Sequence, residues 1–211
     1  MLLFRFTILF CFVYFFSHAQ TKPSNGLSIG EAAPKTDLLM QNVDGGELSL
    51  LQAKNKNGLI VLFSCNTCPF VVGTPDFPGW ENSYNLLFKE ALRNKVGLVL
   101  VNSNEGKRDG ADSFEEMKKH AHENNYKMPY LLDKNSILAD AFGAKTTPHV
   151  YLFNKDLVLV YAGSIDNMAN NKRKKVHSYL LNALLSQSNE TKIKPTTTAP
   201  IGCSIKRIKK P

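Results

Sequence analysis

Two short apolar runs stand out from the mixed pattern of apolar and polar positions. Residues 59–63 read Leu-Ile-Val-Leu-Phe, and residues 97–101 read Gly-Leu-Val-Leu-Val. Runs of this length without polar alternation are typical of strands that are buried on both faces of a sheet. We therefore expect both runs to be central strands.

Segments with the apolar spacing or capping residues of helices follow the strands. Helices are predicted over residues 80–92, 112–125 and 135–142. The second of these opens with Asp112-Ser113 ahead of Glu115-Glu116, which is a helix-capping pattern. A last helix is predicted from one apolar stripe that comprises Val176, Tyr179, Leu180, Ala183 and Leu184.

Two hairpins complete the pattern. The turn Asp44-Gly45 separates residues 37–43 from residues 47–50, and residues 149–153 return through a polar turn as residues 157–162. Strands that alternate with helices predict an α/β fold with a central mixed sheet flanked by helices. The first hairpin is expected to be an N-terminal extension of this sheet.

The length of 211 residues and the 43% hydrophobic composition suit one domain with a real core. Residues 1–19 carry one positive charge, a nearly unbroken apolar run, and small residues at the end, which indicates a secretory signal peptide. An uncleaved anchor would need a longer apolar stretch. We expect an exported protein, periplasmic or secreted, whose mature form does not span a membrane.

The mature chain divides into a domain over residues 20–185 and a C-terminal tail over residues 186–211. The tail is polar and rich in Thr, Lys and Pro, so it is predicted to be flexible. Basic clusters at residues 172–175 and 206–210 contribute much of the net charge of +8. No aromatic residues interleave with them as base platforms would, so nucleic-acid binding is not expected. A solvated face, or contact with anionic lipid or an acidic partner, fits these clusters better.

The candidate chemistry lies in the cysteines. Cys65 and Cys68 form a Cys-x-x-Cys pair directly after the first buried strand and ahead of a predicted helix, which is the sequence form of a thioredoxin-like redox centre. Cys65, placed just before the helix, is predicted to be the attacking thiolate, and Cys68 to resolve the mixed disulfide. Pro69 is expected in the first helical turn.

Other interpretations of the pair are weaker. A structural disulfide across two intervening residues would constrain the unfolded chain little. A zinc site needs about four ligands, and the histidines show no second paired spacing. Cys203 in the tail is a candidate relay thiol toward Cys65 or Cys68; it could equally pair with another chain or stay unpaired.

Thr147-Pro148 lies just before the strand predicted over residues 149–153. The bond can be trans, as at an ordinary strand start, or cis. In a cis arrangement the backbone beside Thr147 and Pro148 would bind an extended substrate segment next to the sulfurs.

Over residues 29–185 the chain resembles the thioredoxin superfamily, and specifically its redoxin or AhpC/TSA-like group. The resemblance is carried by Ile29-Gly30 with Ala33-Pro34, the turn Asp44-Gly45, Phe63 to Phe70, Thr146 to Pro148, Val101 to Asn104 with Asp112-Ser113, and Gly202 to Lys206. It implies a thioredoxin-like fold, a cis Thr147–Pro148 bond beside the dithiol, and thiol oxidoreductase or antioxidant activity.

Two departures from the family pattern bear on the expected activity. The Pro-x-x-x-Thr-x-x-Cys pattern of peroxiredoxins is absent: the matching positions hold Gly58 and Leu62 before Cys65, and Val61 and Cys65 before Cys68. Leu59 stands where thioredoxins have a buried Asp. Either Glu81 or water is expected to move the second thiol's proton in its place, or the proton transfer is slower.

The leading hypothesis is an exported thiol:disulfide oxidoreductase. It would exchange disulfides with protein or small-molecule thiols and with an electron donor or acceptor of its compartment, without a bound cofactor or metal. A thiol peroxidase and a non-catalytic metal-binding or interaction module remain open alternatives.

Overall fold

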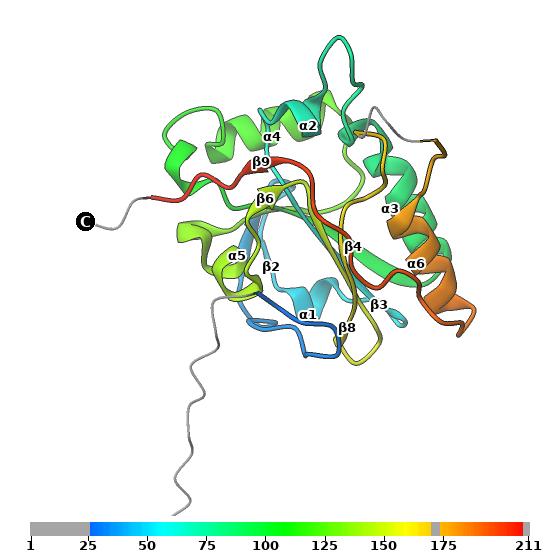
Figure 1. Ribbon diagram of the computed structural model, residues 1–211. Helices are drawn as coiled ribbons and strands as arrows, with labels where there is room; N and C mark the ends of the chain where they lie inside the picture. The colour runs from blue at the N-terminus through cyan, green and yellow to red at the C-terminus, as the bar shows by residue number, and fades with distance from the viewer. Residues whose placement is uncertain (1–25, 170–173, 209–211) are drawn as a thin grey trace, which may run out of the picture.

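The computed structural model describes residues 26–169 and 174–208 (Figure 1). The predicted signal peptide, residues 1–19, lies outside the described residues, as do parts of both basic clusters. Within these two described ranges, no helix has the length and apolar character needed to cross a membrane.

Seven strands form one mixed sheet, in the order β2-β1-β5-β4-β3-β7-β8. They are β1 Met40–Asn42, β2 Glu47–Leu48, β3 Gly58–Ser64, β4 Val96–Asn102, β5 Tyr130–Leu132, β7 His149–Phe153 and β8 Leu159–Gly163. The central strands β3, β4 and β5 are parallel, and the remaining pairings in this sheet are antiparallel. A separate two-stranded sheet pairs β6, Thr146–Thr147, with β9, Cys203–Ser204.

The two apolar runs are the buried centre of the sheet, as predicted. Every residue of β3 and of β4 is buried. Side chains of β3 alternate between two hydrophobic cores: Ile60 and Leu62 join one, and Leu59, Val61 and Phe63 join the other. This is why the run shows no polar alternation.

Helices cover both faces of the sheet (Figure 1). The helices are α1 Leu50–Ala53, α2 Pro69–Val72, α3 Tyr84–Arg93, α4 Phe114–Glu123, α5 Ile137–Phe142 and α6 Tyr179–Ser188, with 3-10 turns at Glu81–Ser83, Glu105–Lys107 and Lys134–Ser136. Helices α2, α3, α4 and α6 place apolar residues in the first core, and α1 and α5 place theirs in the second. The predicted cap of α4 is present, because the Glu116 N–H donates to Ser113 Oγ.

One predicted element boundary needs correction. Val176 was expected in the stripe of the last helix, but α6 begins at Tyr179 and Val176 is exposed. The first hairpin forms at the predicted turn and, because β1 pairs with β5, it extends the main sheet at its edge.

The C-terminal segment, residues 189–208, is packed on the domain, contrary to the prediction of a flexible tail. Thr196 O and the Thr198 N–H bond the backbone of Ala162 at the sheet edge. Ile205 is buried in the second core, and β9 lies beside β6 (Figure 1). The polar composition of this segment predicted disorder. A few spaced apolar residues and backbone pairing are nevertheless enough to order it.

Candidate redox site

The Cys-x-x-Cys loop, residues 65–68, joins the carboxyl end of β3 to α2. Cys65 directly follows the last residue of β3, and Cys68 occupies the N-cap position of α2. The sequence placed Cys65 next to the helix; the structure gives that position to Cys68. Pro69 is in the first helical turn, as predicted.

All three described cysteines are free thiols. Cys65 is 2% exposed and Cys68 is 3% exposed. The two sulfurs share a hydrogen bond, and both contact Thr147. Cys65 Sγ lies 3.1 Å from Thr147 Oγ1, and Cys68 Sγ lies 3.1 Å from Thr147 O.

The Thr147–Pro148 peptide bond is cis. Thr147 is fully buried, and its contacts to both sulfurs place this peptide against the dithiol. The structure therefore brings together Cys65, Cys68 and Thr147-Pro148, which lie some eighty residues apart in the sequence.

The contacts give the two thiols opposite acidities. The hydrogen bond from Cys65 lowers the pKa of Cys68 to about 5 in spite of burial, and contacts from Cys203 act in the same direction. The same shared hydrogen bond raises the pKa of Cys65 well above its ordinary value, and burial and the nearby Asp112 carboxylate add to this. These shifts make Cys68 the more acidic of the two thiols. In the described arrangement its S–H donates to Thr147 O.

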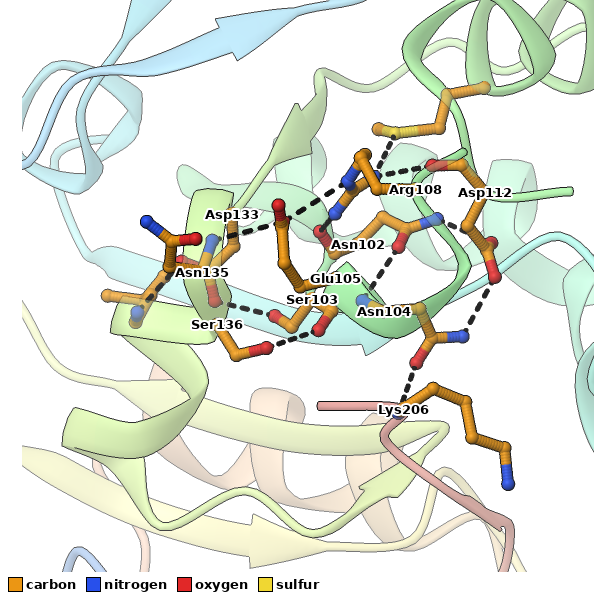
Figure 2. Close-up of polar contacts among 12 residues, drawn as sticks. Asn102, Ser103, Asn104, Glu105, Arg108, Asp112, Asp133, Asn135, Ser136 and Lys206 are labelled. Atoms are coloured by element: carbon orange, nitrogen blue, oxygen red, sulfur yellow. Dashed lines mark hydrogen bonds and ion pairs between the residues drawn. The ribbon is translucent and has the colours of Figure 1, made fainter. Parts of the chain in front are cut away.

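The buried carboxylate of Asp112 binds the backbone of the Cys-x-x-Cys loop. Asp112 has no exposed surface, and its Oδ1 accepts from the Asn66 N–H at 2.9 Å and from Asn102 Nδ2 at 2.7 Å. Its Oδ2 accepts from Asn104 Nδ2 at 2.9 Å (Figure 2). We call these four residues, Asn66, Asn102, Asn104 and Asp112, the Asp112 network. It fixes the backbone between the two cysteines.

Arg108 binds the backbone of two residues of this network. Its guanidinium donates to the carbonyl oxygens of Asn102 and Asp112 and pairs with Glu105 (Figure 2). These acceptors belong to the end of β4 and to the loop that follows it. Arg108 therefore keeps the Asp112 network assembled.

Glu81 lies in a different cluster from the thiols. Its carboxylate pairs with His120 Nε2 at 2.7 Å and accepts from Tyr126 OH at 2.9 Å. Asp112 is the carboxylate whose charge acts on Cys65. The sequence did hold a signal for it: Asn102 to Asn104 lie at the end of β4 and directly after it, and the carboxyl ends of parallel neighbours β3 and β4 meet at one edge.

The histidine nearest to the site has no metal-binding partners among the described residues. His149 follows Pro148 and packs against Tyr151, with ring centroids 4.5 Å apart. Burial lowers the pKa of His149 to about 4. Across residues 26–169 and 174–208, no group of three or more His, Cys, Asp or Glu side chains gathers in a way that could hold a metal ion.

A mixed sheet with a dithiol at the carboxyl end of a central parallel strand, facing a cis proline, defines a thioredoxin-like redox protein. The chain belongs to the AhpC/TSA family, whose model matches residues 29–162. A search of curated protein sequences finds no match.

Solved structures agree with this fold. An uncharacterized conserved protein from Geobacillus kaustophilus is 31% identical, with a TM-score of 0.78 over 89% of this chain and 96% of that one. A hypothetical protein from Sinorhizobium meliloti is 25% identical, with a TM-score of 0.76 over 87% of this chain and 97% of that one. Peroxidoxin BcpB from Mycobacterium tuberculosis, at 13% identity and a TM-score of 0.55 over 78% of this chain and 97% of that one, shares the fold.

Proposed function

We propose that the protein is a thiol:disulfide oxidoreductase whose redox couple is the Cys65–Cys68 pair. The observation that carries the proposal is the pair of buried free thiols held against Thr147, of which Cys68 is the more acidic. A thiolate is the reactive form in disulfide exchange. The apolar leader at residues 1–19 supports export to a compartment where disulfides form.

The roles of the two cysteines follow from their surroundings. Cys68 thiolate attacks a disulfide sulfur, which forms a mixed disulfide and releases one thiolate. Cys65 then attacks Cys68 Sγ, closes the Cys65–Cys68 disulfide and releases the second thiolate, which takes up the Cys65 proton. Two electrons pass from the dithiol to the partner. These roles reverse the order expected from sequence, because the stabilising contacts converge on Cys68.

The partner would approach beside α2. A hollow of about 280 Å³ lies there, lined by Pro69, Phe70, Thr74, Asp76, Phe77 and Ala169. Its aromatic side chains suit an apolar segment of a protein or peptide that carries the disulfide. No bound cofactor takes part in these steps, because the electrons are held in the dithiol.

Exchange with a peptide disulfide tests the proposal. Cys68→Ser is expected to lower the exchange rate by at least about 100-fold, because it removes the thiolate. Cys65→Ser is expected to leave Cys68 held in a disulfide that the wild type does not accumulate. Thr67→Ser, at the exposed position between them, is the matched control and should exchange like the wild type. Full activity in both serine variants would refute the proposal.

A thiol peroxidase is the second candidate, favoured by membership of the AhpC/TSA family and by the acidic Cys68. Consumption of hydrogen peroxide with a dithiol reductant distinguishes it. Peroxide loss that depends on Cys68, in a protein without disulfide exchange, would support this second function.

A further inference from the structure

The C-terminal segment covers the dithiol. Cys65 and Cys68 are almost completely buried, whereas Cys203 is partly exposed. Of the three described thiols, Cys203 is therefore the one that solvent and partners reach first. A buried dithiol that must exchange with a partner needs either an opening of this cover or a route through it.

Cys203 contacts Cys68 directly. The backbone N–H of Cys203 points at Cys68 Sγ, with a nitrogen-to-sulfur distance of 3.4 Å. Cys68 therefore lies next to Cys65 in the Cys-x-x-Cys loop and in contact with the backbone of Cys203.

The pairing of β6 with β9 positions Cys203 beside Cys68. In the antiparallel pair of β6 and β9, Cys203 lies opposite Thr147, the same residue that contacts both buried sulfurs. Gly202 packs so closely that a Cβ atom at this position would lie 2.1 Å from Thr147 O. Only glycine allows the segment to approach Thr147 at this distance.

Polar contacts anchor the residues that follow Cys203. The Ile205 N–H donates to Lys145 O at 2.9 Å, and the Lys206 N–H donates to Asn104 Oδ1 at 2.9 Å. Asn104 donates to Asp112 in the Asp112 network (Figure 2). Asp112 also accepts from the Asn66 N–H between the two cysteines. One set of buried hydrogen bonds therefore positions both the Cys-x-x-Cys loop and the segment that carries Cys203.

We propose that Cys203 is a third redox thiol, which forms a disulfide with Cys68 and carries exchange between the buried dithiol and the partner. This inference rests on the proposed function of the Cys65–Cys68 pair and names the route by which that pair reaches its partner. The segment stays paired with β6 while exchange proceeds.

The steps balance. In this route Cys203, in place of Cys68, makes the first attack on the partner disulfide. It forms a mixed disulfide and releases one partner thiolate, which takes up the Cys203 proton. Cys68 thiolate attacks Cys203 Sγ, forms the Cys68–Cys203 disulfide and releases the second partner thiolate. Cys65 attacks Cys68 Sγ, forms the Cys65–Cys68 disulfide, and passes its proton to the freed Cys203 thiolate. The partner gains two electrons, and the dithiol loses them.

Disulfide mapping tests the inference. In Cys65→Ser, treatment with a limiting amount of oxidised glutathione is expected to yield a Cys68–Cys203 disulfide, detected by mass spectrometry of proteolytic peptides. Cys203→Ser in the wild-type background is expected to slow exchange by about tenfold or more, because the fixed thiol neighbour is lost. Ser204→Ala changes the neighbouring exposed residue of β9 and is the matched control, with a wild-type rate.

Two results would overturn the inference and leave the proposed function intact. The first is a glutathione adduct on Cys68 of Cys65→Ser with Cys203 still free. The second is a Cys203→Ser rate equal to or above that of the wild type, which would mean that the segment only covers the site. Absence of exchange in the wild-type protein would instead refute the proposed function.

Discussion

Cys65 and Cys68 are separated by two residues and are buried to nearly the same extent, yet their surroundings differ. Cys68 Sγ receives hydrogen bonds from Cys65 and from the Cys203 backbone, whereas Cys65 lies within the field of the Asp112 carboxylate. A negative charge at Cys68 gains these donors in spite of the nearby Thr147 O, whereas one at Cys65 gains the Thr147 hydroxyl but meets repulsion from Asp112. The chemistry of the pair depends on this asymmetry.

The asymmetry predicts a single thiolate over a wide pH range. Because the pKa of Cys68 is lowered to about 5, its thiolate is present above that pH and is lost as the pH falls through it. The ultraviolet absorbance of the thiolate, followed by titration of the reduced protein, should show one acidic step. Cys68→Ser should abolish this step. A step that persists in Cys68→Ser and vanishes in Cys65→Ser would reverse the assignment.

Among the elements, the short pair of β6 and β9 lies directly against the dithiol. Two residues from each strand bring the C-terminal segment onto Thr147. The pair is small, so its stability depends on close backbone approach and on the anchors that follow Cys203. A change at the point of closest approach should therefore detach β9 without disturbing the main sheet.

Gly202→Ala is such a change. Its Cβ would overlap Thr147 O, so β9 is expected to leave β6 and expose the dithiol. The reaction of Cys65 and Cys68 with a water-soluble thiol reagent should become about tenfold faster or more, since local opening governs access to buried groups. Circular dichroism should report an unchanged fold. Reagent kinetics equal to those of the wild type would show that β9 does not shield the sulfurs.

In the whole molecule, the Asp112 network joins segments that are far apart in the sequence. It links the loop after β4 to the C-terminal segment at Lys206 (Figure 2). Through the Asn66 N–H it also links the loop after β3. Three nitrogen donors converge on one buried carboxylate. The network thus stabilises the site and the fold together.

Asp112→Ala should destabilise the protein by roughly 3 kcal/mol or more, because it leaves the donors of Asn66, Asn102 and Asn104 without an acceptor in the interior. Urea unfolding followed by circular dichroism measures this change in the free energy of unfolding. Asp109→Ala removes an exposed carboxylate from the same loop and serves as the control, with a change below about 0.5 kcal/mol. Equal effects of the two substitutions would refute a structural role for the network.

Local patterns explain which features could be predicted from sequence. The buried strands β3 and β4, the capped helix α4 and the Cys-x-x-Cys loop are each encoded within a few consecutive residues. The position of Cys68 at the start of α2, the burial of Asp112 and the packing of the C-terminal segment depend on contacts between distant residues. Composition and spacing carry little information about such contacts.

The pairing of β6 with β9 also has a kinetic consequence. A thiol that is held in contact with Cys68 by its own chain reacts in a unimolecular step, and its effective concentration can exceed the roughly millimolar level typical of loosely tethered groups by a wide margin. Free small thiols in the surroundings would compete poorly with Cys203 for a disulfide at Cys68. The chain would thereby select its own third cysteine over the soluble thiol pool, and the exchange would become insensitive to that pool's concentration.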